Sequence, residues 1–143
     1  MSSCCTTSCC CSNVNVSEEQ EVKEVFNTWL KAVSTGSPDA VMSLYADNAV
    51  LLPTLAPTVC DTPAKRLEYF KVFTANENLQ GKIDELHTRV MGDVAVNSGH
   101  YTFTFKKNGE QVTAAARFTY VYKKTSFGWM IVEHHSSLLP AGH

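Results

Sequence analysis

Three turn signals divide the second half of the chain at strand-length intervals, and this pattern limits the fold more than any other feature. They lie at Gly92-Asp93, Asn108-Gly109 and Phe127-Gly128, between runs rich in Val, Thr, Tyr and Phe. Asn-Gly is the strongest two-residue hairpin signal, because both central residues of the favoured turn need positive φ. The sequence from Lys82 onward therefore predicts four long antiparallel strands.

The Asn108-Gly109 turn also predicts the register of the two strands that it joins. If Lys107 pairs with Glu110, one face carries aromatic residues opposite small partners. The pairs on that face are Phe105 with Val112, Phe103 with Ala114 and Tyr101 with Ala116. The other face gathers polar pairs, namely Thr104 with Thr113, Thr102 with Ala115 and His100 with Arg117. We expect this polar cluster on a curved sheet to form a pocket.

The first half of the chain predicts helices. Ser17 followed by Gln20 makes a capping box, and Gly36 offers a left-handed stop, so a helix is expected from about Ser17 to Thr35. Its apolar residues recur on one face: Val22, Val25, Phe26, Trp29, Leu30 and Val33. A single apolar stripe of this kind packs against another element, here the sheet.

Two shorter helices and a strand are expected between that helix and the sheet. Ser37 and Pro38 begin a helix that continues through Met42, Leu44 and Tyr45 and ends at Asp47 and Asn48. A strand follows at 49–52 and a proline-containing loop at 53–61. Thr62 and Pro63 open a third helix, in which we expect Leu67, Phe70 and Phe73 to be buried and Lys65, Arg66, Glu68 and Lys71 to be solvated.

Length and charge indicate one domain and exclude some partners. The chain has 143 residues, with 12 Lys and Arg against 14 Asp and Glu. That length suits one core, and the near-neutral balance argues against nucleic acid as a partner. No apolar run approaches the ~20 residues that cross a bilayer, so no membrane span is expected. Helices followed by a bent antiparallel sheet predict an α+β fold, with the first helix across the concave face.

The cysteines divide into a cluster and a single residue. The cluster Cys4, Cys5, Cys9, Cys10 and Cys11 lies in residues 1–16, and only Cys60 falls in the expected domain, 17–143. One cysteine cannot cross-link a core, which favours a reducing, cytoplasmic location. Residues 1–16 are uncharged and poor in large apolar groups, so we expect a disordered tail. Soft-metal ligation, reversible acylation and the start of a targeting peptide remain alternatives for the clustered thiols.

Four residues are the candidates for a ligand-binding pocket, namely Arg117, His100, His134 and Glu133. Arg117 lies in an apolar strand, where we expect it to point inward and to bind either an anion or the carboxylate of Glu133 or Glu85. His100 lies opposite Arg117. On the last strand, alternation places Val132, His134 and Ser136 on one face and Ile131, Glu133, His135 and Ser137 on the other. Burial would raise the pKa of Glu133 into a useful range. No metal or cofactor is expected.

The last part of the chain resembles a known family. Trp129 to Pro140, WMIVEHHSSLLP, with residues 116–122, ARFTYVY, is similar to the association (hub) domain of calcium/calmodulin-dependent protein kinase II. The similarity extends from about Ser17 to Pro140. It is shared with SnoaL-like and ketosteroid-isomerase-like proteins of the nuclear transport factor 2-like, cystatin-like cone fold.

The resemblance implies a self-assembling domain that forms a ring of stacked dimers. In the family, several arginines and a histidine line a cavity that accepts small carboxylates, and Arg117 matches one of these arginines. Two other arginine positions of the family fall here among His100, Tyr101 and Thr102 and at Ser136, so neither position holds an arginine. We expect a free-standing hub-like protein whose partner is itself, with a small carboxylate ligand and a kinase or other hub-domain protein as further possibilities. Calmodulin enters only through the family name.

Two functions therefore compete. The first is a non-enzymatic oligomerisation domain whose subunit contacts use an outer aromatic face, made of Tyr101, Phe103, Phe105, Tyr120 and Tyr122. The simpler alternative for these residues is that the helices cover them. The second function is a small-molecule isomerase or dehydratase that uses the cone cavity, with Glu133 and His134 as its candidates.

Overall fold

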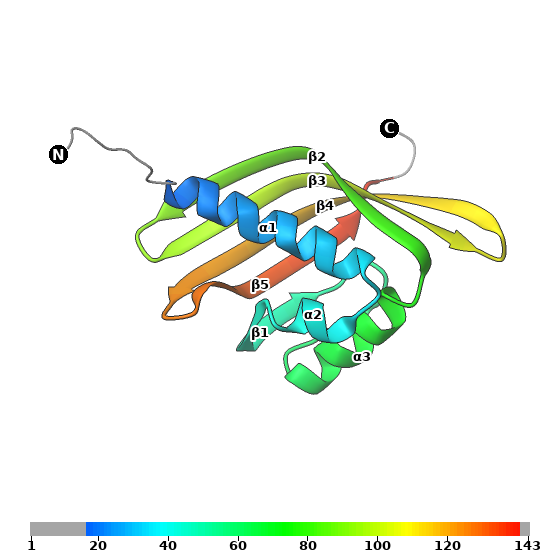
Figure 1. Cartoon of the computed structure of the whole chain (residues 1–143), viewed down its shortest axis with the longest axis horizontal. Helices are drawn as coiled ribbons and strands as arrows, with labels where there is room; N and C mark the ends of the chain where they lie inside the picture. The colour runs from blue at the N-terminus through cyan, green and yellow to red at the C-terminus, as the bar shows by residue number, and fades with distance from the viewer. Residues whose placement is uncertain (1–16, 141–143) are drawn as a thin grey trace.

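The computed structural model describes residues 17–140, which form three helices and five strands (Figure 1). In chain order these are α1 (Glu18–Ser34), α2 (Pro38–Met42), β1 (Tyr45–Leu52), α3 (Pro63–Phe73), β2 (Glu77–Met91), β3 (Val94–Lys107), β4 (Glu110–Thr125) and β5 (Gly128–Leu138). The cysteine-rich segment 1–16 and its expected disorder lie outside the described residues.

The five strands form one curved sheet in the order β1-β5-β4-β3-β2. The pairs β2–β3, β3–β4 and β4–β5 are antiparallel, and β1 pairs with β5 in parallel. Asn108 and Gly109 both have positive φ, at 55° and 81°, as the hairpin prediction requires. Every pair predicted between β3 and β4, from Lys107–Glu110 to His100–Arg117, is present. The expected α+β fold is confirmed.

Local capping sets the ends of the helices as predicted. The Ser17 hydroxyl accepts a hydrogen bond from the Gln20 amide at 3.1 Å at the start of α1. After the C-cap at Thr35, Gly36 takes the left-handed conformation at φ 79°. At α3, the Thr62 hydroxyl accepts from the Lys65 amide at 3.2 Å. These contacts involve neighbours in sequence, which is why the sequence predicts them well.

The first strand is longer than expected. Helix α2 ends at Met42, and β1 already begins at Tyr45, so the prediction of a helix through Tyr45 to Asp47 is wrong. The reason is parallel pairing with β5: the Ile131 amide donates to the Leu44 carbonyl at 2.9 Å, and Tyr45 pairs with Ile131. That partner lies far along the chain and is invisible to local patterns.

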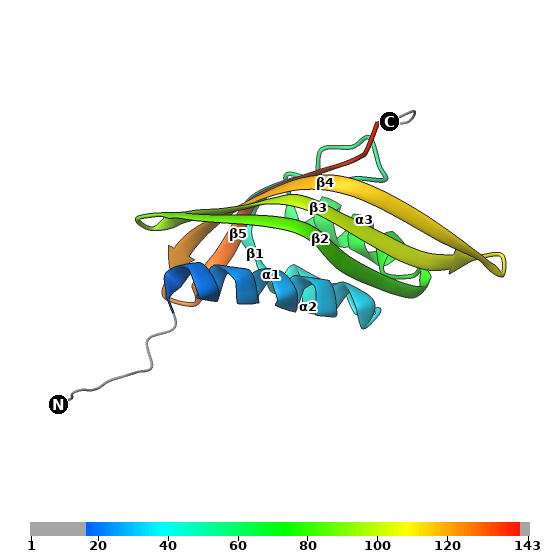
Figure 2. The same cartoon turned by 90° about the horizontal axis from the view of Figure 1, so that it is seen from above.

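Helix α1 lies across the concave face of the sheet (Figures 1 and 2). Phe26 and Trp29 of α1 pack on the aromatic rings of that face, for example Phe26 on Phe118 with ring centroids 4.7 Å apart. The expectation of an outer aromatic face is therefore wrong, because at most 8% of any of its five residues is exposed: Tyr101, Phe103, Phe105, Tyr120 and Tyr122. These five side chains lie in the hydrophobic core rather than on an outer surface.

Gly99 allows the sheet to bend where β2 and β3 pair. The register of β2 shifts between Ile83 and Glu85, and Glu85 pairs with His100, next to Gly99. Gly99 has φ 154°, and a Cβ placed there would lie 2.0 Å from the Glu85 carbonyl oxygen. Only glycine tolerates this approach of two backbones.

We expect Gly99→Ala to lower the free energy of unfolding by about 3 kcal/mol or more, because backbone strain adds to a clash with main-chain atoms. Gly92→Ala is the matched control, since Gly92 also has positive φ but nothing within 4 Å of its added Cβ. It should cost only about 1–2 kcal/mol. Urea denaturation of both variants measures the difference, and equal losses would contradict the role assigned to Gly99.

Candidate functional site

The four residues predicted to share a pocket lie on opposite faces of the sheet. Arg117 and Glu133 are exposed on the convex face, and His100 is half-buried there. His134 is only 3% exposed and points into the concave face. The structure therefore keeps the His100–Arg117 pair and separates His134 from it. The expectation that Arg117 points into the fold is wrong.

A β-bulge in β5 explains the different positions of Glu133 and His134. Val121 pairs with Glu133, and the next residue, Tyr122, pairs with Ile131, so Val132 is the extra residue. The bulge puts Ile131 and His134 on the same buried face, which strict alternation does not allow. Glu133 faces outward and is exposed, so the prediction that it is buried is wrong.

A chain of hydrogen bonds crosses the core beneath α1. The Trp29 indole N–H donates to the Tyr45 hydroxyl at 2.9 Å, and this hydroxyl lies 2.7 Å from His134 Nδ1. Because the Tyr45 oxygen accepts from Trp29, its own proton is free to go to Nδ1. His134 is then neutral and carries its proton on Nε2, which is buried and has no hydrogen-bond partner among residues 17–140.

A second chain joins β3, β5 and the loop after β1. The Tyr101 hydroxyl donates to Ser136 Oγ at 2.7 Å, and the Thr54 hydroxyl donates to the same oxygen. The Tyr101 and Tyr120 hydroxyls lie 3.4 Å apart, and the Tyr120 ring stacks on His134 with centroids 3.8 Å apart. The two chains therefore meet at Tyr120 and His134.

Burial keeps this cluster uncharged. It raises the pKa of Tyr101 to about 12 and raises the pKa values of Tyr45 and Tyr120 well above that of a free phenol. It lowers the pKa of His134 well below 6.5, and the neighbouring His135 lowers that pKa further. Neutral donors and acceptors suit a packed core or a neutral polar group, and they disfavour an anion.

Arg66 of α3 has a structural role that the sequence does not reveal. We expected it to be solvated, but it is buried, and this expectation is wrong. Its guanidinium donates to the carbonyls of Ala49 at 2.6 Å and of Ala46 and Asp47 at 3.0 Å each. These carbonyls are available because the register of β1 shifts between Tyr45 and Val50. Arg66 therefore attaches α3 to the edge strand β1.

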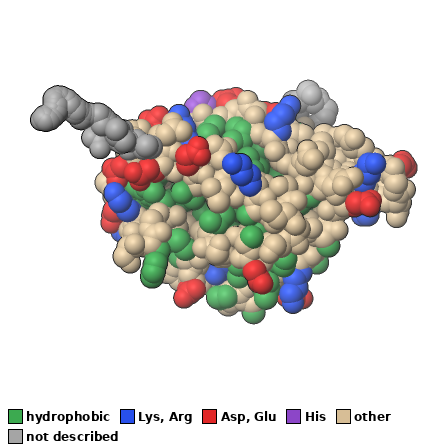
Figure 3. All heavy atoms as spheres, viewed as in Figure 1, with side chains coloured by type: hydrophobic (Ala, Val, Ile, Leu, Met, Phe, Trp, Pro, Cys, Tyr) green, Lys and Arg blue, Asp and Glu red, His purple; other side chains and the backbone are tan. Residues whose placement is uncertain are grey.

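An apolar groove of about 460 Å³ lies between α3 and the loop at 53–61. We call it the α3 groove. In Figure 3, hydrophobic side chains reach the surface in the lower half of the view, where α2 and α3 lie. The groove is lined mainly by apolar side chains, including Leu55, Ala56, Cys60, Tyr69, Val72 and Phe73. The sequence does not reveal this groove, because it forms only where the loop, closed by the Leu51–Cys60 backbone pair, folds beside the helix that follows it.

Residues 17–140 hold neither a cluster of metal-ligating side chains nor a membrane-crossing helix. Within them, no three His, Cys, Asp or Glu side chains are grouped as a metal site would need. No helix in this part of the chain has the length and apolar character needed to cross a membrane.

The chain matches one protein family over most of its length. Residues 18–140 match the family described as the calcium/calmodulin dependent protein kinase II association domain. No curated protein gave a significant match. A solved structure from Xanthomonas campestris, described as an association domain of the same kind, is 39% identical, with a TM-score of 0.81. The alignment covers 86% of this chain and 89% of that one.

More distant structures share the fold. The CaMKII hub of S. rosetta is 23% identical with a TM-score of 0.76, and 88% of this chain and 100% of that one align. A protein from Streptomyces avermitilis, described as a dehydratase of the NTF2-like family, is 21% identical with a TM-score of 0.79, over 87% and 97% of the two chains. One fold thus carries differently described functions, so the fold alone does not decide between them.

We expect the stability of the protein to fall as the pH drops from about 6.5 to about 5. The unfolded chain binds a proton at His134 near pH 6.5, whereas the folded chain resists it, so His134 contributes up to about 1.4 kcal/mol per pH unit to the loss. Urea denaturation across this range measures the slope. His134→Asn should flatten it, and the control His135→Asn, at an exposed position, should not. An unchanged slope in His134→Asn would contradict the assignment.

Proposed function

We infer that this chain, which belongs to the calcium/calmodulin dependent protein kinase II association domain family, is a self-associating hub-like domain that forms a closed ring of dimers. The family match and the 39% identical association domain from Xanthomonas campestris support self-association. A kinase or another hub-domain protein is a further proposed partner, on the strength of the family name alone.

The observation that carries the proposal is the uncovered convex face of the sheet. All three helices leave it free, as the view from above shows for α1 (Figure 2). Its central outward residues are small or half-buried: Val96, Ser98, Thr102, Thr104, Thr113, Ala115, Thr119 and Val121. Among the outward positions of β3 from 96 to 104 and of β4 from 113 to 121, Arg117 alone is permanently charged. Depletion of charge is typical of the centre of an interface.

A small carboxylate is the proposed ligand of Arg117 and His100. These two residues pair across β3 and β4 on the convex face, and Ser137 of β5 pairs with Arg117 on its other side. The planar guanidinium fork binds carboxylates through two parallel hydrogen bonds, and the histidine and serine can add a third. Glu133 and His134 are not part of this site, because Glu133 pairs with Val121 rather than with Arg117 and His134 lies on the buried face.

We expect the full chain, under reducing conditions, to have a mass of several subunits by light scattering. Ala115→Arg should lower the mass at least twofold, because it buries an unpaired charge at the centre of the convex face. Gln111→Arg, on the exposed end of the same strand, is the control and should leave the mass unchanged. A monomeric wild-type protein would contradict self-association, whereas an unchanged mass in Ala115→Arg would contradict only the choice of face.

We expect a small dicarboxylate such as succinate to bind the wild-type protein more tightly than the Arg117→Gln variant, by about tenfold or more. Isothermal titration calorimetry measures both affinities. Lys107→Gln, at the β3–β4 hairpin, removes an exposed positive charge elsewhere and serves as the control. Equal binding to all three proteins, or to none, would refute the proposed site.

A further inference from the structure

The most exposed large hydrophobic side chain of the described residues is at the turn between β4 and β5. Phe127 is 89% exposed. The turn that carries it is closed by two hydrogen bonds: the Thr125 hydroxyl donates to the Gly128 carbonyl at 2.9 Å and accepts from the Phe127 amide at 3.0 Å. The side chain is therefore presented on a defined turn rather than on an irregular loop.

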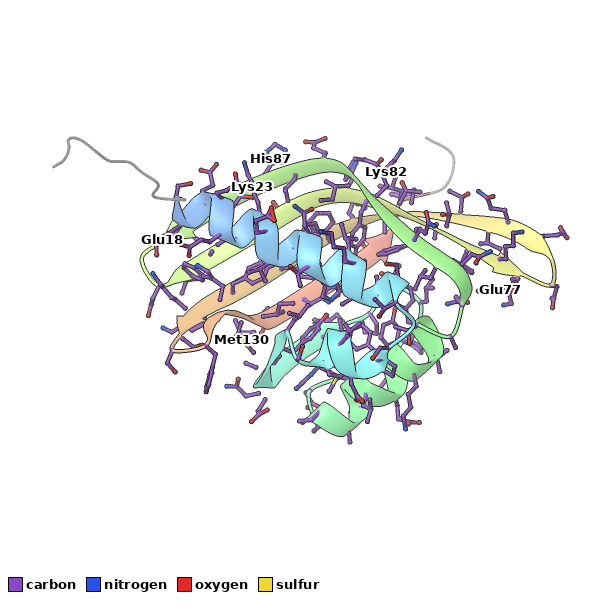
Figure 4. All side chains as sticks on the ribbon, viewed as in Figure 1. Glu18, Lys23, Glu77, Lys82, His87 and Met130 are labelled. Carbon is purple, nitrogen blue, oxygen red and sulfur yellow. The ribbon has the colours of Figure 1, made fainter. Side chains whose placement is uncertain are left out.

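The base of this hairpin is held against the start of α1. Lys124 forms an ion pair with Glu18 at 2.6 Å, and the Trp129 indole N–H donates to Glu21 at 3.2 Å. Figure 4 shows Glu18 at the beginning of α1, close to the hairpin, and Met130 just after it on β5. These contacts fix the direction in which the turn projects, away from the core of its own chain, where Trp129 is buried and Phe127 is not.

The α3 groove is a preformed apolar receptor on the same chain. Its loop wall is held by a two-way backbone pairing, in which Leu51 and Cys60 exchange N–H···O bonds of 2.9 and 2.8 Å. Val72, on the helix wall, is 73% exposed, and Leu55, on the loop wall, is also exposed. Apolar side chains on both walls of the groove are therefore in contact with water. The volume of the groove is sufficient for an aromatic side chain and part of the turn that carries it.

The turn and the groove lie at opposite ends of β5. The loop that forms the groove follows β1, and its first part is anchored to Ser136 by the hydrogen bond from Thr54. Ser136 is eight residues beyond Gly128, where β5 begins, which corresponds to about 26 Å of extended strand. Phe127 therefore cannot reach the groove of its own chain, whereas a second copy of this chain presents the same groove.

We propose that Phe127 of one copy inserts into the α3 groove of the next copy, so that the subunits associate head to tail. The inference rests on the proposed self-association and names one of its contacts. Each copy uses its turn on one neighbour and its groove on the other, which is a heterologous contact. Repetition of this contact closes a ring when the rotation between neighbouring subunits is a whole fraction of a full turn. A separate two-fold contact through the convex face would then join subunits in pairs.

The test uses full-length variants and light scattering under reducing conditions. We expect Phe127→Glu and Val72→Glu each to lower the assembly mass at least twofold. Both side chains are exposed, so the fold should be retained, and thermal melting by circular dichroism checks this. Met91→Glu is the matched control, because Met91 is an exposed hydrophobic residue at the end of β2, next to the β2–β3 turn.

Mixing the two variants tests the direction of the contact. Val72→Glu retains a functional turn and Phe127→Glu retains a functional groove, so an equimolar mixture should form a complex heavier than either variant alone. Failure of the mixture to do so would overturn the head-to-tail contact. Full mass in both variants, or an equal loss in Met91→Glu, would also overturn it and leave self-association intact. A monomeric wild-type protein would overturn both.

Discussion

The structure depends on the burial of an aromatic sheet face beneath one amphipathic helix. Phe26 and Trp29 of α1 pack into the concave face, and the tyrosines there bring hydroxyl groups into the buried core. A buried hydroxyl without a partner costs free energy, so the side chains must satisfy one another. The hydrogen bonds from Trp29 through Tyr45 to His134, and from Tyr101 to Ser136, are the result. The core is thus ordered by polar pairing as well as by apolar packing.

This arrangement assigns different tasks to the two faces of the sheet. The concave face mainly serves the fold, because its polar groups other than His134 Nε2 are hydrogen-bonded to one another and burial keeps its titratable groups neutral. The convex face, the β4–β5 turn and the α3 groove remain available to other molecules. A search for function among the buried tyrosines and His134 would therefore address the stability of the protein, whereas its partners should be sought on these outer surfaces.

The sequence predicted those features that depend on neighbouring residues, and failed where distant segments meet. The Asn108-Gly109 turn predicted the β3–β4 register, and Ser17 and Gly36 predicted the ends of α1. Three features could not be predicted. The parallel β1–β5 pairing involves residues far apart. The bulge at Val132 breaks the alternation of β5, and Glu133, expected to be buried because it lies between Val132 and His134 in an apolar strand, faces outward. Arg66 binds carbonyls exposed by a register shift in β1. The resemblance of residues 116–140 to the association domain predicted the family, but it did not predict which side chains face outward.

The parallel pairing of β1 with β5 also has a consequence for the order in which the protein folds during synthesis. Tyr45 of β1 and His134 of β5 contact each other in the core but are 89 positions apart in the sequence. Strand β1 therefore leaves the ribosome long before β5, its only neighbouring strand in the described sheet, exists. Until residues 128–138 emerge, the hairpins of β2, β3 and β4 can form and α3 can pack on β3 through Phe73 and Phe103, but β1 has no strand to pair with. Contacts of such long sequence separation form slowly. Pairing of β1 should therefore be a late step, and its apolar side chains stay exposed to other molecules until then.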